Sequence, residues 1–415
     1  MRITETTIPG LLIIDLNVHG DNRGWFKENW QREKLTELAP ELASFQPVQN
    51  NISYNHAGAT RGLHAEPWDK LVSVAHGKIF GAWCDLREGS ESFGEVVTHE
   101  VGPETAVFVP RGVANGFQAL EETSYCYLVN EHWSAEARYA AVNLNIVDWP
   151  LEPTEISEKD KQHPNLAEVS PMPARRILVT GANGQLGRAL KRLLADAEFC
   201  THADFDITNP PERNWKQYSA IINCAAYNDV NGAENDRAAA WAVNAEGPAK
   251  LARIAAENQI TLVHVSSDYI FDGANEVHSE EELPSPLSVY GASKAAGDTA
   301  AQTAPQHYVI RTSWVFGDGE NFMSTMRRLA AKGVEPKVIH DQRGRPTFAE
   351  DLAKGIVHLL NSDADYGVYN LSNSGDTVGR DEIAMAVFIG IGHDPAEVTP
   401  VSTEQYREIA GPEIG

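Results

Sequence analysis

The chain has 415 residues, with 34 Lys and Arg against 58 Asp and Glu, which gives a formal net charge of −24. Apolar residues make up 42% and charged residues 22%, the usual balance of a globular protein of two or three domains. The acidic charge argues against a nucleic-acid or anionic-membrane partner, because both need clustered Lys and Arg.

The cysteines and the apolar runs indicate the compartment. No CxxC pair or metal spacing occurs, so we expect reduced thiols in a cytoplasmic protein, at Cys84, Cys126, Cys200 and Cys224. No apolar run approaches the ~18 residues of a membrane span. The apolar run 11–14 ends at Asp15 and is typical of a strand rather than a signal peptide.

Short β-rich segments separated by turn residues fill the first 150 residues. The predicted strands are Val72–Ala75, Lys78–Trp83, Val96–Val101, Ala106–Val109 and Ser124–Val129. One helix is predicted over Arg32–Ala39, because Pro40 ends its periodicity. Many short strands without crossover helices predict an all-β jelly roll, which we assign to residues 1–164.

The stretch FVPRGVANGF at 108–117 resembles the second motif of the cupins, a jelly-roll family. Metal-binding cupins place a His three residues after the motif's first glycine, where this chain has Asn115. They also have an earlier HxH pair, where this chain has only His64. One imidazole does not make a zinc or iron site, so we predict no catalytic metal. A lone His is more often structural than functional.

The motifs around His64 favour a functional role for it, because together they resemble the dTDP-4-dehydrorhamnose 3,5-epimerases over about residues 1–165. The matching stretches are DNRGWFKENW, VQNNIS, TRGLH, KLVSVAHGKIFGAWCDLREGSESFGE, FVPRGVANGF and SEKD. The resemblance implies His64 as a base oriented by Asp160, Lys70 as the group that stabilises an enolate, and Tyr127 as the opposing acid. It also implies substrate contacts from Arg23, Glu28, Gln49, Asn51, Arg61, Asn115, Trp133 and Lys159.

The chemistry suits these residue types. C3 and C5 of a 4-keto sugar are acidic because both are α to the carbonyl, and inversion needs a base on one face and an acid on the other. Tyr125 lies two residues from Tyr127, so both side chains point to one face of a strand and either could be the acid. The loop from His64 to Lys70 is shorter than usual in the family, and Asn115 replaces a family His, which leaves single against double epimerisation open.

A proline-rich, charged stretch separates the two halves. Pro164, Pro171 and Pro173 lie in or beside it. Proline fixes its own φ and restricts the residue before it, so we predict an extended linker at 165–174.

From residue 175 the chain alternates short apolar strands with helical segments. Strands are predicted at 177–179, 221–222, 261–265 and 308–311, and helices over Leu186–Ala195 and Arg237–Asn258. This alternation predicts an α/β Rossmann domain with a doubly wound parallel sheet over residues 175–415.

A glycine-rich turn, GANGQLG at 181–187, follows the first of these strands and opens a helix. Such a turn lets the backbone approach a pyrophosphate at the helix N-terminus. A plain structural turn is the alternative.

Tyr290 and Lys294, at i and i+4, lie on one face of a predicted helix, where an ammonium can lower the pKa of a phenol. Ser267 follows the strand 261–265, at the end where such sheets bind ligands. A YxxxK spacing alone often occurs by chance. Chance does not easily explain the combination of a glycine loop, a serine and YxxxK in this order.

At this point the sequence resembles the extended short-chain dehydrogenases, and among them the dTDP-4-dehydrorhamnose reductases, over about 175–400. The matching stretches are ILVTGANGQLG, NCAAYNDVNGAE, HVSSDYIFDG, SVYGASKAAGD, IRTSWVFG and HDQRGRPTFAEDLA. The resemblance implies a catalytic trio of Ser267, Tyr290 and Lys294, and substrate contacts from Asp268 and Trp314. It implies cofactor contacts from Gly181, Gly184, Gln185, Leu186, Gly187, Asp206, Ile207, Cys224, Ala225, Ala226, Tyr290 and Lys294.

Several features of this half stay open. Trp314 could be a core residue, and Asp206 could begin a capping turn. We predict NADPH as cofactor, with NADH possible. The choice stays open because no clear Arg for a 2′-phosphate or acidic residue for the ribose is evident, and Arg188 and His202 are the only nearby candidates. The chain ends at Gly415, before the basic, Pro-containing segment that usually follows in the family.

The two resembled enzymes act in sequence on one nucleotide sugar. We therefore predict a bifunctional enzyme that makes dTDP-L-rhamnose from dTDP-4-dehydro-6-deoxy-D-glucose, with a dTDP-4-keto-6-deoxy sugar as its ligand. We expect a homodimer that associates through the cupin domain, as epimerases of this type usually do. The alternatives are the same chemistry on another dTDP-4-keto-deoxysugar and a non-catalytic NAD(P)-binding regulatory protein.

Overall fold

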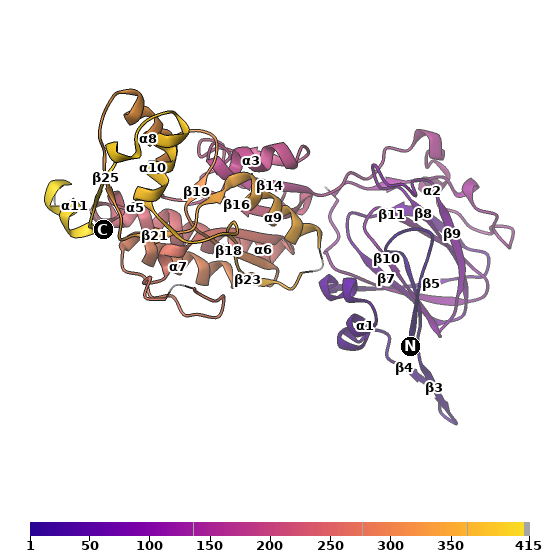
Figure 1. Cartoon of the computed structure of the whole chain (residues 1–415). Helices are drawn as coiled ribbons and strands as arrows, with labels where there is room; N and C mark the ends of the chain where they lie inside the picture. Colours follow the sequence, from indigo (N-terminus) through magenta and orange to yellow (C-terminus); the bar gives the residue numbers. More distant parts are fainter. Residues whose placement is uncertain (136, 276, 363, 411–415) are drawn as a thin grey trace. The chain divides into compact units, whose positions relative to one another are not determined.

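The computed structural model describes residues 1–135, 137–275, 277–362 and 364–410 (Figure 1). They form two compact units, the first from Met1 to Ala174 and the second from Arg175 onward. The end of the chain at 411–415, where we noted a departure from the family, lies outside the described residues. No described helix is long and apolar enough to cross a bilayer.

Two antiparallel sheets make up most of the first unit (Figure 1). The order β1-β2-β10-β7-β12-β5 gives six strands: Arg2–Glu5, Leu12–Asp15, Thr105–Val109, Lys70–His76, Thr123–Val129 and Gln49–Asn55. The order β13-β6-β11-β8-β9 gives five: Ala140–Ala141, Thr60–Ala65, Val113–Ala119, Ile79–Asp85 and Val96–Val101. A separate hairpin pairs β3 (Val18–Asp21) with β4 (Gly24–Lys27).

The core of this unit lies between the two sheets. Val72 and Val74 of β7 are buried together with Trp83 of β8 and Phe117 of β11. The predicted all-β sandwich is confirmed. The predicted strands match β7 to β10 and β12 to within about two residues, whereas β6 and β11 were not predicted, although they hold His64 and Asn115.

Two segments cover the outer faces of the sandwich. Helix α1 (Arg32–Leu38) begins where the Gln31 side chain accepts a hydrogen bond from the Lys34 amide, and it ends just before Pro40. The short helix α2 (Glu158–Lys161) follows the cap residue Ser157.

The stretch 165–174, expected as a linker, packs against the first unit. Met172 is buried there, and the partly buried Leu166 and Val169 contact the same apolar cluster. Proline excludes long helices from this stretch but does not prevent it from docking.

The second unit has a parallel sheet at its centre, with the order β15-β14-β16-β17-β18-β23. Its strands are Glu198–Cys200, Arg176–Thr180, Tyr218–Asn223, Thr261–Ser267, His307–Thr312 and Gly367–Asn370. Short two-stranded pairs join β19 (Val315–Phe316) with β22 (Thr347–Phe348), β20 (Lys337–Ile339) with β25 (Thr399–Val401), and β21 (Arg343–Gly344) with β24 (Val378–Gly379).

Helices cover both faces of this sheet, as predicted for a doubly wound fold. On one face α3 (Gln185–Leu193) and α9 (Ala349–Asn361) contribute to one apolar cluster, and on the other α6 (Gly247–Asn258) and α7 (Val289–Ala301) contribute to a second. The remaining helices are α4 (Gly232–Asn235), α5 (Arg237–Trp241), α8 (Phe322–Ala331), α10 (Arg380–Gly390) and α11 (Thr403–Ala410).

The strand order reverses direction between β14 and β16. In open parallel sheets ligands bind at such a switch point, beyond the carboxyl ends of the strands. The glycine-rich turn follows β14 and residues 224–226 follow β16, so the fold places both at that point.

The predicted helix Arg237–Asn258 is present but not uniform. A π-helical turn at Ala242–Glu246 separates α5 from α6. Its Asn244 is buried, and the side-chain amide bonds both backbone groups of Tyr227 and the Ser293 hydroxyl of α7. The π-helical turn is therefore hydrogen-bonded to α7 through Ser293, which lies between the expected catalytic residues Tyr290 and Lys294.

Candidate active sites

In the first unit a histidine and a buried aspartate form a close pair. His64 Nε2 lies 2.8 Å from Asp160 Oδ1, and Asp160 Oδ2 accepts a 3.1 Å hydrogen bond from the Gly62 amide. Burial raises the pKa of Asp160, but the hydrogen bonds from His64 and Gly62 outweigh it and place that pKa at about 2. The carboxylate is therefore ionised, and it can orient and charge His64.

Lys70 and Tyr127 lie together at the ends of β7 and β12. The Lys70 ammonium is 5.1 Å from the centre of the Tyr127 ring and 2.7 Å from Glu66 Oε1. Burial raises the pKa of Tyr127, the Glu66 charge raises it further, and Arg61 opposes both. Glu66 was not predicted, although its position four residues before Lys70 in the short loop was a usable signal.

The structure separates the two tyrosines of β12. Their rings are 5.7 Å apart on one face, as the spacing predicted. Tyr125 is 3% exposed and stacks on Phe117, and its hydroxyl accepts a 3.1 Å hydrogen bond from Asn115 Nδ2. Tyr127 is only partly buried, so its hydroxyl is the better placed of the two to meet a ligand.

Other expected contact residues lie on β5, β6 and β11 and in the loop after β12. Gln49 bonds Asn51 at 2.9 Å and accepts a 3.3 Å bond from the Trp133 amide. Asn51 lies opposite Tyr127 in the strand register, and Asn115 lies opposite His64. Arg61 bonds the Asn55 side chain at 2.7 Å.

Three expected residues lie apart from this group. Arg23 pairs with Asp21 at the tip of the β3–β4 hairpin, and Glu28 pairs with Lys34. Lys159 is exposed on α2. Among the described contacts, none joins these three side chains to His64, Lys70 or Tyr127.

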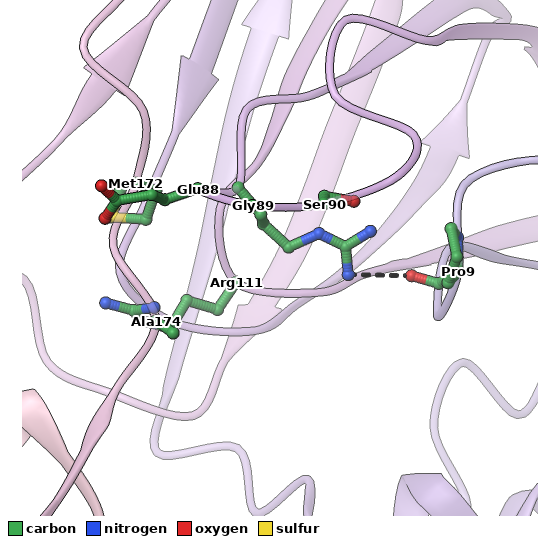
Figure 2. Close-up of a pocket in the computed structure, with 8 residues that line it drawn as sticks. Pro9, Glu88, Gly89, Ser90, Arg111, Met172 and Ala174 are labelled. Atoms are coloured by element: carbon green, nitrogen blue, oxygen red, sulfur yellow. Dashed lines mark hydrogen bonds between the residues drawn. The ribbon is translucent and has the colours of Figure 1, made fainter. Parts of the chain in front are cut away.

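A cavity in the first unit is lined by Arg87, Arg111 and six further residues, none of which we expected at the active site (Figure 2). Its Arg87 is held by Asp85 at 2.7 Å and donates to the Pro9 carbonyl at 3.0 Å, the dashed line in Figure 2. Its Arg111 donates to the Pro173 carbonyl at 2.8 Å. The guanidinium groups of Arg87 and Arg111 therefore both make contacts that stabilise the fold of the first unit.

In the second unit a cavity opens at the carboxyl ends of β14, β16, β17 and β18. It is lined by Gly184, Gln185, Leu186, Gly187, Cys224, Ala226, Asn228, Val230, Val265, Ser266, Ser267, Asp268, Tyr269, Tyr290, Lys294, Thr312, Trp314, Val315 and Arg380. The fold thus brings the glycine loop and the Ser–Tyr–Lys trio to one place.

The backbone packs so closely at two positions of the glycine loop that a side chain would not fit there. Gly181 has φ +69°, and a Cβ there would lie 2.7 Å from the backbone of Cys224 and Ala225. A Cβ on Gly187 would lie 2.5 Å from the Gly181 carbonyl oxygen. Gly184 is the cap residue of α3 and provides no side-chain cap. The first amides of α3 can therefore meet a phosphate.

Tyr290 and Lys294 are deeply buried, and Ser267 is partly buried. Lys294 donates a 2.7 Å hydrogen bond to the Val265 carbonyl of β17, and burial lowers its pKa to about 8. Burial raises the pKa of Tyr290 to about 12, and a hydrogen bond with Ser267 opposes this. The phenol pKa is therefore not lowered as we expected from the YxxxK spacing, because desolvation outweighs the hydrogen bond with Ser267.

Asp268 and Trp314 both line the cavity. Asp268 accepts a 2.6 Å bond from Ser313 and a 3.1 Å bond from Ser267, and burial raises its pKa. Trp314 has φ +36°, and a Cβ on Gly344 would lie 2.4 Å from its ring. The Arg380 guanidinium lies 4.9 Å from the centre of that ring. Arg380 was not predicted, since 66 residues separate it from Trp314.

The remaining cofactor candidates fall into two groups. Cys224 and Ala226 line the cavity, with Ala225 between them, whereas Ile207 is buried in the core cluster. Asp206 accepts bonds from the Thr208 amide and hydroxyl, both at 2.8 Å, in a turn that begins no helix. Arg188 donates to the carbonyls of Asn183 and Asp318, while His202 is exposed.

Comparisons with known proteins agree with the two-unit structure. A family model described as dTDP-4-dehydrorhamnose 3,5-epimerase matches residues 5–168, and one described as RmlD substrate binding domain matches residues 175–411. A Streptococcus pyogenes serotype M6 protein called RmlC homolog is 51% identical over 176 residues, 40% of this chain and 89% of that protein.

The second unit has equally clear relatives. A dTDP-4-dehydrorhamnose reductase of Mycobacterium tuberculosis is 41% identical over 247 residues, 56% of this chain and 81% of that protein. The crystal structure of dTDP-4-dehydrorhamnose reductase from Bacillus anthracis in complex with NADP is 34% identical, with a TM-score of 0.51, over 56% of this chain and 86% of that one. The chain is therefore a fusion that belongs to two families, the dTDP-4-dehydrorhamnose 3,5-epimerases through its first unit and the RmlD-type dTDP-4-dehydrorhamnose reductases through its second.

Proposed function

We propose that this chain converts dTDP-4-dehydro-6-deoxy-D-glucose to dTDP-L-rhamnose, by 3,5-epimerisation in the first unit and reduction of the 4-keto group in the second. The observation that supports this best is the presence of two complete proton-transfer sets in one polypeptide. One is His64–Asp160 with Lys70 and Tyr127, and the other is Ser267, Tyr290 and Lys294.

In the first unit we assign His64 as the base. Asp160 accepts from Nε2, which leaves the Nδ1 lone pair for a proton on C3 or C5 of the sugar. The enolate oxygen that forms is stabilised by the Lys70 ammonium, as in an oxyanion hole. Tyr127 returns a proton on the opposite face, and its raised pKa keeps it protonated at neutral pH. Gln49, Asn51, Arg61, Asn115 and Trp133 surround this group as substrate contacts.

In the second unit Tyr290 acts as the acid. When bound by the residues that line this cavity, a nicotinamide would supply a hydride to C4. Ser267 polarises the C4 carbonyl, and Tyr290 then protonates the oxygen. A pKa of about 12 suits a proton donor that must stay protonated until charge develops on its partner. Lys294 is charged at neutral pH and stabilises the tyrosinate left behind. Asp268 and Trp314 position the sugar.

The residues of the cavity fit a dinucleotide. The three glycines at 181, 184 and 187 leave the backbone open to a pyrophosphate at the start of α3, and Gln185, Leu186, Cys224 and Ala226 line the space beyond. We propose NADPH as the preferred cofactor, supported by the NADP complex of the Bacillus anthracis reductase. Our candidates for reading the ribose are Arg188 and His202, with Asp206 as a further cofactor contact.

We propose that the epimerase chemistry needs no metal, because base, acid and enolate stabiliser are all side chains.

We also propose a homodimer formed through the cupin unit. The edge strand β5 exposes Ile52 at 68% and Tyr54 at 58%, and Phe26 on the hairpin is 65% exposed. If the hairpin reaches a second copy, Arg23 arrives at the partner's site. A cytoplasmic location suits the four free cysteines and the use of nucleotide substrates.

A second candidate is the same chemistry on another dTDP-4-keto sugar. A Streptomyces antibioticus protein named as a probable dTDP-4,6-dihydroxy-2-methyloxan-3-one 4-ketoreductase is 37% identical over 247 residues. Product stereochemistry, determined by NMR, distinguishes this candidate from rhamnose formation.

The test is NADPH oxidation with dTDP-4-dehydro-6-deoxy-D-glucose by the intact chain and by two single-site variants. We expect oxidation by the intact chain, no oxidation by Tyr290→Phe, and slowed or rerouted oxidation by His64→Asn. Cofactor binding without oxidation by the intact chain would exclude this substrate and leave the second candidate or a binding role.

A further inference from the structure

A buried histidine, His163, lies beside the His64–Asp160 pair. Its side chain is 7% exposed, its polar neighbours are the Gly62 backbone and Asp160, and neither ring nitrogen makes a hydrogen bond of good geometry with a described residue. Its ring centre is 5.0 Å from that of His64, nearly perpendicular to it. The proton-transfer scheme above does not use His163.

Besides its hydrogen bonds, this group brings three possible metal ligands close together. One nitrogen of each imidazole and one oxygen of Asp160 all lie within 4.8 Å of one another. Asp160 Oδ1 is 2.8 Å from His64 Nε2 and 3.8 Å from His163 Nε2. With zinc–ligand bonds of about 2.0–2.2 Å, tetrahedral ligands lie roughly 3.3 Å apart, between these two distances. Small side-chain rotations therefore suffice to close the site.

We propose that His64, Asp160 and His163 form an inhibitory site for a divalent cation of the zinc class. Two imidazole nitrogens and a carboxylate oxygen are ligands that Zn²⁺ prefers, whereas Mg²⁺ and Ca²⁺ prefer oxygen alone. The inhibitory part rests on the proposed role of His64 as the base. The cation takes no part in epimerisation.

The cation inhibits by changing the tautomer of His64. In the free enzyme Nε2–H donates to Asp160 and the Nδ1 lone pair takes the substrate proton. A cation on Nε2 uses the lone pair of that nitrogen, so the single ring proton moves to Nδ1 and the ring stays neutral. His64 then has no lone pair for substrate, and Asp160 is held by the cation as well.

The first test measures binding without reference to activity. Zn²⁺ is titrated calorimetrically into the intact chain, His163→Gln and His393→Gln, and Co²⁺ absorption reports the ligand geometry. His393 is a matched control, since it lies 3.0 Å from the Glu397 carboxylate on the surface of the other unit. We expect one tetrahedral site, weakened at least tenfold in His163→Gln, unchanged in His393→Gln, and restored in His163→Cys, which supplies a thiolate. Equal affinity of His163→Gln and the intact chain would overturn the proposal.

The second test measures inhibition, relative to the metal-free rate of each protein. We expect Zn²⁺ to inhibit epimerisation by the intact chain, EDTA to restore it, and His163→Gln to need at least tenfold more Zn²⁺. Reduction of a pre-epimerised 4-keto-L-sugar should be unaffected. Tight binding at this site without inhibition would overturn the inhibitory role. Binding by a chain that shows no epimerisation even without metal would instead contradict the proposed function and leave the site standing.

Discussion

Two tyrosines of one strand show how environment separates residues of identical type. Tyr125 and Tyr127 both face the core of the sandwich, but Tyr125 is closed in by Phe117 and Asn115, whereas Tyr127 lies beside the Lys70 ammonium. Spacing along the strand could not choose between them. Their different neighbours come from β7, which pairs with β12, and from β11 of the other sheet, and only folding brings these strands together.

Tyr127→Phe should therefore lower the epimerisation rate by about 10²–10⁴-fold, the usual contribution of a general acid. Tyr125→Phe should leave the rate within a few fold and lower stability by about 1 kcal/mol, because the Asn115 amide loses its partner. Proton exchange at C3 and C5, followed by NMR, measures the rate in each variant. A larger loss in Tyr125→Phe than in Tyr127→Phe would reverse the assignment.

The buried Lys294 predicts the pH dependence of reduction. Its pKa is lowered to about 8, so the ammonium is present at pH 7 and is lost as the pH rises through 8. Tyr290, with a pKa of about 12, stays protonated over the same range. Single-turnover reduction of a pre-epimerised sugar should fall above pH 8. A rate that stays level to pH 10 would show that the Lys294 charge is not needed.

At the scale of elements, the turn after β8 depends on one carboxylate. Asp85 is completely buried and accepts bonds from Arg87, Ser90 and Ser92. Burial raises its pKa, but these bonds outweigh that effect and place it at about 2. A carboxylate with a lowered pKa contributes stability above its unfolded pKa of about 3.9, and that stability is lost as the pH falls toward 2.

Asp85→Asn should thus destabilise the first unit by roughly 2–4 kcal/mol at pH 7, and the difference should shrink between pH 5 and pH 3. Hydrogen–deuterium exchange of peptides that cover β8 and β9 measures it. Asp15→Asn is the control, because its pair with Arg2 is exposed and should contribute less than about 1 kcal/mol. Equal effects of the two substitutions would contradict this account of the turn.

Elements whose formation depends on a local apolar pattern were predicted well from the sequence. Strands that form only by pairing with other strands were predicted less well. The four central strands of the parallel sheet were predicted because each is a short apolar run between turn residues, whereas the edge strands β15 and β23 were not. β6 and β11 were missed because Gly62, Gly116 and polar residues interrupt their apolar pattern, and only pairing with β8 and β13 makes them strands. For the same reason the contacts of Glu66, His163 and Arg380 became visible only in the fold.

At the scale of the whole molecule, each unit has its own core and its own candidate site. The two activities should therefore be separable by substitution. A mixture of full-length His64→Asn and Tyr290→Phe chains should convert dTDP-4-dehydro-6-deoxy-D-glucose to the reduced sugar, although neither variant alone does so efficiently. NADPH oxidation by the mixture and by each variant measures this. Failure of the mixture, with each variant keeping its one intact activity, would show that both sites must be in the same chain.

The most direct test of the central claim is the isotope pattern of the product made in D₂O with unlabelled NADPH. The two proposed sites predict dTDP-L-rhamnose with deuterium at C3 and C5, from proton exchange during epimerisation, and protium at C4, from the cofactor. NMR of the isolated product reads all three positions at once. A product labelled at only one of C3 and C5, or reduced without any label and with the D configuration kept, would contradict the assignment of the first unit.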